Sequence, residues 1–154
     1  MKQDIEQIAF LRALRRLARA LDLHSGRINR DSGLTLPQLI VLTCIRDLGS
    51  ATGRAIALAA DLSPPTVVGI LDKLESKGLI VRHRSEEDRR SVHARLTARG
   101  ADFLDRAPAP MGDGFARGLS ALPAPERARM LADLERLVAM TGAPTVSNGE
   151  AGKN

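Results

Sequence analysis

Apolar residues recur every three or four positions between Ser63 and Lys77, and this spacing predicts a helix with one buried face. Ser63 is a favourable N-cap, Pro64 suits the first helical turn, and Gly78 suits the end of the helix. The buried stripe consists of Val67, Ile70, Leu71 and Leu74. We therefore expect a short helix over residues 63–77 that packs on the rest of the protein through one side.

The other face of this helix combines small and polar residues in a way that needs an explanation. Gly69 in a helix interior costs about 1 kcal/mol relative to Ala, and Val68 beside it gains nothing from exposure to water. A smooth face of this kind suits close approach to another surface, although the pattern also fits an ordinary surface helix of modest stability. The face carries Pro65, Val68, Gly69, Asp72, Lys73 and Ser76.

Two short strand patterns follow the helix, at residues 79–84 and 91–96, and the second alternates apolar and polar positions strictly. The loop between them is wholly polar and ends in Arg89 and Arg90. Upstream, residues 56–62 predict a short helix closed by a turn. A helix, a turn, a capped helix and a basic hairpin together predict a winged helix-turn-helix. Such a module can place a helix in the major groove of duplex DNA and a β-ribbon beside it.

The two ends of the chain predict amphipathic helices that the rest of one chain cannot cover. The first helix is expected to begin at Asp4, with a capping box to Gln7, and to end near Leu23, before a polar connector at residues 24–33. Self-association would cover both apolar stripes. The pattern therefore predicts a two-fold homodimer that presents two reading helices about 34 Å apart to a near-palindromic site.

The middle and the C-terminal part of the chain are also predicted to be helical. Thr35 and Gln38 form a second capping box, and the apolar run after them predicts a central helix buried on most sides. Thr97 caps a further helix, which is expected to break near Ala107 because prolines and glycines follow. A last helix is expected to begin near Pro125.

These segments resemble the MarR (multiple antibiotic resistance regulator) family of transcription factors. The resemblance lies between residues 34 and 100. It rests on the order and spacing of LTLPQ from Leu34, LSPPT from Leu62, LDKLE from Leu71, KGLI from Lys77, DRR from Asp88 and LTARG from Leu96. It implies a mainly α fold with a small β-hairpin wing, that is, a winged helix-turn-helix flanked by dimerisation helices.

We therefore expect one domain over residues 1–140. The winged helix-turn-helix is expected at about 51–100, the dimerisation helices at about 4–23 and 101–140, and a disordered tail at 141–154.

Composition narrows the class of partner. The 154 residues carry a net charge of +5, which favours polyanionic partners. Three phenylalanines without Tyr or Trp argue against single-stranded nucleic acid, whose bases stack on aromatic side chains. No apolar run approaches the roughly 18 residues of a membrane helix, and the acidic start does not fit a secretory signal. Double-stranded DNA is thus the expected partner, with no membrane and a cytoplasmic location.

The sequence offers little for enzymatic chemistry. It has three histidines, His24, His83 and His93, and it shows no metal-ligand spacing, phosphate-binding glycine loop or Cys/His pair. No enzyme activity, cofactor or metal is expected. Two alternatives stay open: a helical protein–protein interaction module, and a redox-sensing regulator acting through Cys44, the single cysteine. Cys44 fits most simply as a small core residue, because sensing would need exposure and a lowered thiol pKa.

The expected DNA contacts come from the helix front, the basic residues around it and the wing. Thr66 can hydrogen-bond a base edge, and Val68 can touch a thymine methyl group. Arg90 matches the family's wing arginine and is expected in a narrow minor groove, with its guanidinium held by Asp88. The expected phosphate contacts are Arg54, Lys73 and Arg84, and the whole expected set adds Ser63, Pro65, Gly69 and Arg89.

The sequence thus predicts a dimeric DNA-binding transcriptional regulator, with repression the expected mode, that reads duplex DNA through helix 63–77 and wing 80–96. The resemblance also implies release by a small-molecule effector. In the family, small phenolic or lipophilic acids commonly bind between the dimer helices and the winged module and weaken DNA binding. The sequence leaves open whether this chain has an effector and what it is, as well as the operator and the direction of regulation.

Overall fold

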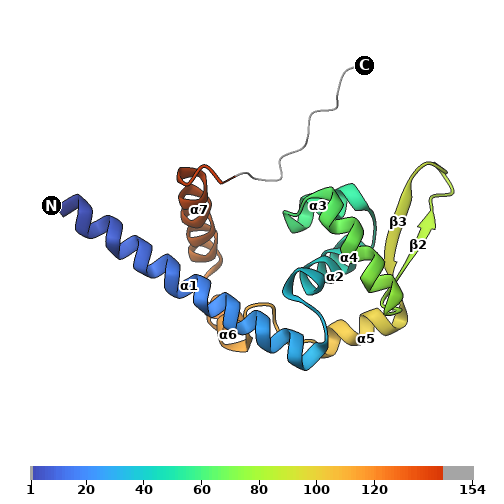
Figure 1. Ribbon diagram of the computed structural model, residues 1–154, viewed down its shortest axis with the longest axis horizontal. Helices are drawn as coiled ribbons and strands as arrows, with labels where there is room; N and C mark the ends of the chain where they lie inside the picture. Colours follow the sequence, from blue (N-terminus) through green and yellow to red (C-terminus); the bar gives the residue numbers. More distant parts are fainter. Residues whose placement is uncertain (1, 144–154) are drawn as a thin grey trace, which may run out of the picture.

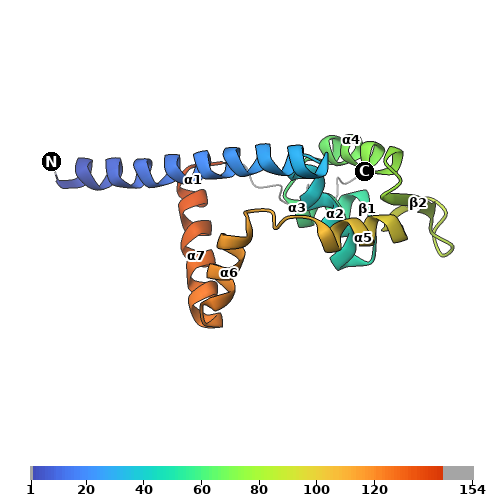
Figure 2. The same ribbon diagram turned by 90° about the horizontal axis from the view of Figure 1, so that it is seen from below.

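The computed structural model describes residues 2–143, with side chains from Asp4 onward, as seven helices and one three-stranded antiparallel sheet. A long N-terminal helix runs along the molecule to a cluster of short helices and the sheet, and two C-terminal helices lie beside its middle (Figures 1 and 2). Residues 144–154, most of the expected disordered tail, lie outside the described residues.

The first helix, α1 (Lys2–Ser32), is longer at both ends than the sequence pattern predicts. Asp4 lies in its first turn and is not a cap, and the expected connector at residues 24–33 is helical up to Ser32. The reason is Ile28, which is completely buried in the core. Burial of Ile28 stabilises the helix across the polar residues around it, and Gly33 ends the helix with a φ of +70°.

The central helix, α2 (Leu36–Leu48), confirms the predicted capping box. The Gln38 N–H donates to the Thr35 hydroxyl at 3.4 Å, and the Thr35 N–H donates to the Gln38 side-chain oxygen at 3.1 Å. The helix is buried on most sides, as its apolar run predicts. Its fully buried side chains are Leu39, Val41, Leu42 and Ile45.

The helix-turn-helix consists of α3 (Gly53–Ala60) and α4 (Pro64–Ser76). Asp61 makes the turn between them in the left-handed conformation, with a φ of 51°. Ser63 caps α4 by accepting the Thr66 N–H at 3.3 Å. The predicted stripe on α4 is buried against the core: Val67, Ile70, Leu71 and Leu74.

The sheet contains β1 (Ser50–Thr52), β2 (Ile80–Arg84) and β3 (Val92–Leu96) in the order β1-β3-β2. The two hairpin strands, β2 and β3, are confirmed. The sequence pattern does not predict β1, because three residues are too few to show strand periodicity. It forms because Ala51 pairs with Ala94 on β3, where both side chains are buried.

The C-terminal segment, predicted as helices over 101–140 with a break near Ala107, consists of α5 (Ala98–Arg106), α6 (Asp113–Ala121) and α7 (Ala124–Met140). The break is confirmed: Ala107 is extended, as a residue before proline tends to be. The loop that follows is held to α1 by a 2.8 Å hydrogen bond between the His24 ring and the Ala109 carbonyl oxygen.

Among residues 2–143, no single helix is both long and apolar enough to span a membrane. Helices α3 and α4 reach that length and apolarity only when taken together, and they are bent by 107° at their junction. Their apolar side chains, including Ile56 and Leu74, belong to the hydrophobic core.

Gly100 lets α5 pack against Leu79, the residue just before β2. A Cβ atom on Gly100 would lie 2.0 Å from the Leu79 carbonyl oxygen, which accepts the Thr97 N–H at 3.1 Å.

We expect Gly100→Ala to lower the free energy of unfolding, measured by urea denaturation, by about 1–3 kcal/mol or more. Gly118→Ala is the control, because a Cβ there meets nothing within 4 Å. Equal stability of Gly100→Ala and the parent chain would contradict the close packing.

Candidate nucleic-acid interface

The front of α4 is exposed, and its centre, at Val68 and Gly69, packs against no other part of the described fold. Val68 is 54% exposed, and a Cβ atom on Gly69 would meet nothing within 4 Å. Internal packing therefore does not require a small residue at Gly69. At the start of the helix, the Ser63 and Thr66 hydroxyls lie 2.7 Å apart in a hydrogen bond on the same exposed side. The remaining front residues, Pro65, Asp72, Lys73 and Ser76, are also exposed.

The tip of the wing is a tight, hydrogen-bonded turn. The Ser85 hydroxyl accepts the N–H groups of Glu87 at 3.2 Å and Asp88 at 3.3 Å, and the Ser85 N–H donates to the Ser91 carbonyl oxygen at 2.9 Å. The Asp88 carboxylate accepts the Arg90 backbone N–H at 3.0 Å. These contacts fix the backbone that carries the two wing arginines.

The expected pairing of the Asp88 carboxylate with the Arg90 guanidinium is not what this structure has. Among residues 4–143, no ion pair joins these two side chains, and the carboxylate binds backbone instead. The physical reason is reach: a short aspartate side chain bonds an N–H two residues ahead at little entropic cost. Asp88 therefore shapes the turn and leaves the Arg90 side chain exposed.

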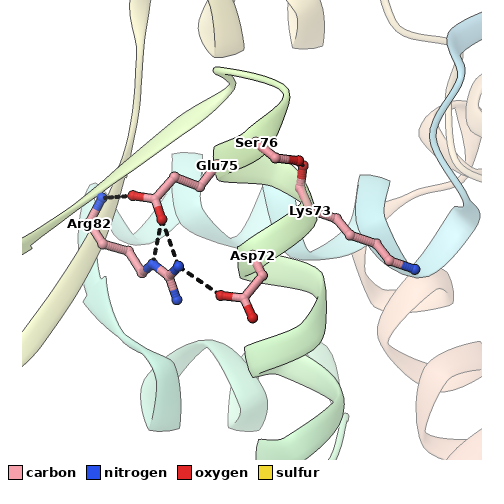
Figure 3. A network of polar contacts seen from close by, with 5 residues as sticks. All are labelled: Asp72, Lys73, Glu75, Ser76 and Arg82. Atoms are coloured by element: carbon pink, nitrogen blue, oxygen red, sulfur yellow. Dashed lines mark hydrogen bonds and ion pairs between the residues drawn. The ribbon is translucent and has the colours of Figure 1, made fainter.

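A polar cluster that the sequence patterns do not predict joins α4 to the wing. Arg82 on β2 reaches two carboxylates on the flank of α4 (Figure 3). Its guanidinium lies 2.7 Å from Asp72 and 2.6 Å from Glu75, and its Nε donates to Glu75 at 2.8 Å. The Arg82 backbone N–H also donates to Glu75, at 3.0 Å. We call these three residues the Arg82 cluster.

The electrostatics of the Arg82 cluster follow from these contacts. Hydrogen bonds from the Arg82 side chain and then its backbone lower the pKa of Glu75 below its usual range, so the carboxylate is charged at neutral pH. The pKa of Arg82 is raised, chiefly by hydrogen bonds to Glu75 and then Asp72. A signal for the cluster is present in the sequence: two carboxylates three residues apart lie on one helix flank and can face the next strand.

The expected phosphate-contacting residues come from three elements: α4, α3 and β2. Lys73 points away from the Arg82 cluster, on the other side of the helix (Figure 3). Arg54 lies exposed in the first turn of α3, and Arg84 lies exposed at the end of β2, toward the wing tip. Arg89 and Arg90 are exposed at the tip itself. Exposed cations thus lie on α4, in the first turn of α3 and on the wing.

Two of the three histidines, His83 and His93, lie together on the wing, and His24 lies on α1. The His83 and His93 rings face each other across the wing strands, with centroids 5.9 Å apart. His93 also lies within hydrogen-bonding distance of Ser50, at 3.4 Å, and of Ser91, at 3.2 Å. Over residues 4–143, no cluster of three His, Cys, Asp or Glu side chains could hold a metal ion.

Cys44 lies partly buried in α2. Burial raises the pKa of its thiol, and the nearby Asp47 carboxylate raises it further. A redox-sensing thiol needs the opposite shift, because the thiolate is the reactive form. The environment of Cys44 therefore favours the core interpretation over the redox alternative.

Comparisons with known proteins agree with this geometry. The model of the MarR family matches residues 34–92. The HTH-type transcriptional repressor Rv2887 of Mycobacterium tuberculosis (strain ATCC 25618 / H37Rv) is 34% identical over 105 residues, which cover 68% of this chain and 76% of that protein.

Solved structures with a similar fold come from other organisms. The transcriptional regulator BldR from Sulfolobus solfataricus is 20% identical with a TM-score of 0.67, over 88% of this chain and 96% of BldR. BpsR of Bordetella bronchiseptica, whose DNA binding is regulated by 6-hydroxynicotinic acid, is 25% identical with a TM-score of 0.60, over 82% of this chain and 98% of BpsR.

The raised pKa of Cys44 predicts a slow thiol. At neutral pH, we expect the folded chain to react with iodoacetamide several-fold more slowly than the same chain unfolded in urea. The folded rate should keep rising at pH values where the unfolded rate has levelled off, because the folded thiol loses its proton at a higher pH. Faster reaction of the folded chain at neutral pH would contradict the assignment and favour the redox alternative.

Proposed function

The chain belongs to the MarR family of transcriptional regulators, and on this premise we propose that it is a homodimeric repressor of transcription that binds a near-palindromic duplex site. The observation that carries the proposal is the front of α4, where an exposed Val68 and an open Gly69 serve no internal packing. The basic wing stands beside this front. Close approach to the floor of the major groove gives such a face a purpose.

In the proposed complex, the first turns of α4 enter the major groove. The Thr66 hydroxyl reaches a base edge or a phosphate, and the Val68 side chain contacts a thymine methyl group. Because Pro65 and Gly69 have little or no side chain projecting from the front of α4, the helix backbone can come close to the bases. The Ser63 cap positions the first turn against the sugar–phosphate backbone.

The cations around α4 and the wing supply the positioning contacts. Arg54, Lys73 and Arg84 neutralise phosphates, which fixes the register of the protein without reading sequence. The exposed Arg90 side chain enters the minor groove where A·T pairs make it narrow and strongly negative, with Arg89 on the adjacent backbone. The Asp88 carboxylate holds the turn beneath them.

The proposed dimer is built from α1 and α7, whose apolar faces are exposed. Leu11 is 53% exposed and Leu131 is 59% exposed, and monomers rarely leave patches of this kind uncovered. A groove of about 690 Å³ lies between the two helices. Its apolar lining consists of Phe10, Leu11, Leu14, Leu137 and Met140. A second copy seated there would place two α4 helices on successive major grooves, about 34 Å apart.

Release by a small-molecule effector is the finer part of the proposal. A cavity of about 820 Å³ lies where the end of α1 meets α5 and the loop before α6, so an occupant would touch both the winged module and the C-terminal helices. Arg99 and Arg106 could bind an acidic group there, and Phe103 offers an aromatic wall. Three aspartates also line the cavity, Asp31, Asp102 and Asp113, so an acidic occupant would have to lie on the arginine side. BpsR, whose regulator is a small aromatic acid, supports this class of effector for the present chain.

The function is tested by selecting a binding site from random duplexes and substituting Gly69. Gly69→Leu is expected to weaken binding to the selected site by about 10–100-fold, because the bulk holds α4 out of the groove. The fold should survive, since that position is open. Gly69→Ala separates bulk from loss of glycine and is expected to raise stability by up to about 1 kcal/mol. Unchanged affinity in a mobility-shift assay would refute the placement, and selection of no duplex would refute the function.

The dimer is tested by sedimentation velocity at micromolar concentration. We expect the parent chain to sediment as a dimer, and Leu11→Asp to shift it toward monomer by placing a charge on the apolar face. Leu58→Asp is the control, because Leu58 is similarly exposed, at 50%, but lies on α3. A well-folded monomer of the parent chain at this concentration would exclude the proposed assembly.

A further inference from the structure

The Arg82 cluster joins α4 to the wing through two ion pairs, from Arg82 to Asp72 and to Glu75 (Figure 3). We propose that Arg82 is a positioning residue for DNA binding. It fixes the pose of the wing on α4, so that the reading helix and the wing-tip arginines meet DNA as one unit. This inference rests on the proposed function, because it concerns how the same DNA-binding face is held together.

The first support is the position of Arg82 on the sheet. In the order β1-β3-β2, β2 is an outer strand, so the N–H groups along its free edge have no strand partner. The Arg82 N–H on that edge donates to Glu75 at 3.0 Å. At Arg82, the Glu75 carboxylate on α4 therefore accepts the hydrogen bond that a neighbouring strand would otherwise accept.

The second support is the geometry of the guanidinium. Its planar fork binds two carboxylates that lie three residues apart on the same helix, at 2.7 Å to Asp72 and 2.6 Å to Glu75. Asp72 itself lies three residues after Gly69, at the border of the α4 front. The Arg82 cluster thus connects the middle of β2 to the face of α4 that is proposed to read DNA.

Two kinds of contact from one residue distinguish positioning from simple charge neutralisation. Neutralising the two carboxylates would need only a cation nearby, in any orientation. Here both the backbone N–H and the side chain of Arg82 are bound, which fixes the place of the strand and also its rotation about its own axis. The carboxylate contacts are solvent-exposed, so their value lies in geometry more than in stability.

A small tilt of β2 at Arg82 produces a larger displacement at the wing tip. An extended strand rises about 3.4 Å per residue, so Glu87 at the tip lies up to about 17 Å beyond Arg82. A tilt of about 10° would then move the tip by about 3 Å, a full hydrogen-bond length. Loss of the Arg82 cluster should therefore displace Arg89 and Arg90, although neither touches Arg82.

The test is a double-mutant cycle on the selected duplex, with affinity as the readout. Arg82→Ala is expected to weaken binding about tenfold. When Arg82→Ala is already present, the further loss of affinity caused by Arg90→Ala should be at least about fivefold smaller than the loss it causes in the parent chain. The control is Arg95→Ala, which removes the same charge from an exposed position on β3. In the double variant Arg95→Ala, Arg90→Ala, the loss of affinity should equal the product of the two single losses to within about twofold, as it does for independent sites. Parent-like affinity of Arg82→Ala, or independence of Arg82 and Arg90, would overturn the proposal.

Two further variants separate geometry from charge. Arg82→Lys keeps the charge but lacks the planar fork, and it is expected to bind DNA more weakly than the parent chain. The triple variant Arg82→Ala, Asp72→Asn, Glu75→Gln removes every charge of the cluster, and it is expected to stay weak as well. Full recovery of affinity in either variant would show that charge alone matters and would overturn the positioning role.

A measurement without DNA keeps this proposal distinct from the proposed function. In hydrogen exchange, Arg82→Ala is expected to speed exchange in residues 80–84 at least about tenfold, while α2 stays protected as in the parent chain. Unchanged exchange in the strand would overturn the proposal even if the parent chain binds DNA. Failure of the parent chain to bind any duplex would instead count against the proposed function.

Discussion

The burial of one side of α4 is the constraint on which the other features depend. Val67, Ile70, Leu71 and Leu74 fill the centre of the core, between α2, α3 and the sheet. Because these four positions fix the rotation of the helix, they also decide which residues are left outside. The exposed front, with Val68 and Gly69 at its centre, is thus a consequence of core packing and not of any interaction made by the front itself. The same rotation turns Asp72 and Glu75 toward the wing.

The fold divides into a winged module and an arm formed by α1, α6 and α7 (Figures 1 and 2). Ile28 anchors the end of α1 in the core, while the rest of that helix projects away with its apolar residues exposed. The loop after Ala107 redirects the chain into α6 and is tied to α1 through His24. In the proposed dimer, these few contacts would set the distance between the two reading helices, so a change at the cavity beside them would be transmitted to both.

Features of the structure that depend on neighbouring residues could be predicted from the sequence. The capping box at Thr35, the Ser63 cap, the α4 stripe and the break at Ala107 each arise within a few residues, and all four are present. Features that depend on distant partners could not. The extension of α1 needs the pocket that buries Ile28, and β1 needs β3 beside it.

The same distinction applies to the candidate site. Residues at the front of α4 could be chosen from periodicity alone, because the buried stripe defines the opposite face. For the Arg82 cluster, the spacing of Asp72 and Glu75 places both carboxylates on one helix flank, but it does not identify Arg82 as their partner, since the helix and the strand meet only in the folded chain. The sequence predicts that Asp88 pairs with the guanidinium of Arg90, whereas its carboxylate binds the backbone N–H of Arg90. Sequence spacing identifies such neighbours, but the reach of a side chain decides which atoms pair.

The central claim is that α4 and the wing of two copies contact one duplex together. Chemical footprinting of the selected duplex tests it most directly, with methylation of guanine N7 for the major groove and hydroxyl radicals for the minor groove. The account predicts two major-groove protections about 10 base pairs apart, each flanked on its outer side by a minor-groove protection from a wing. A single protected major groove, or major-groove protections without flanking minor-groove protection, would contradict it.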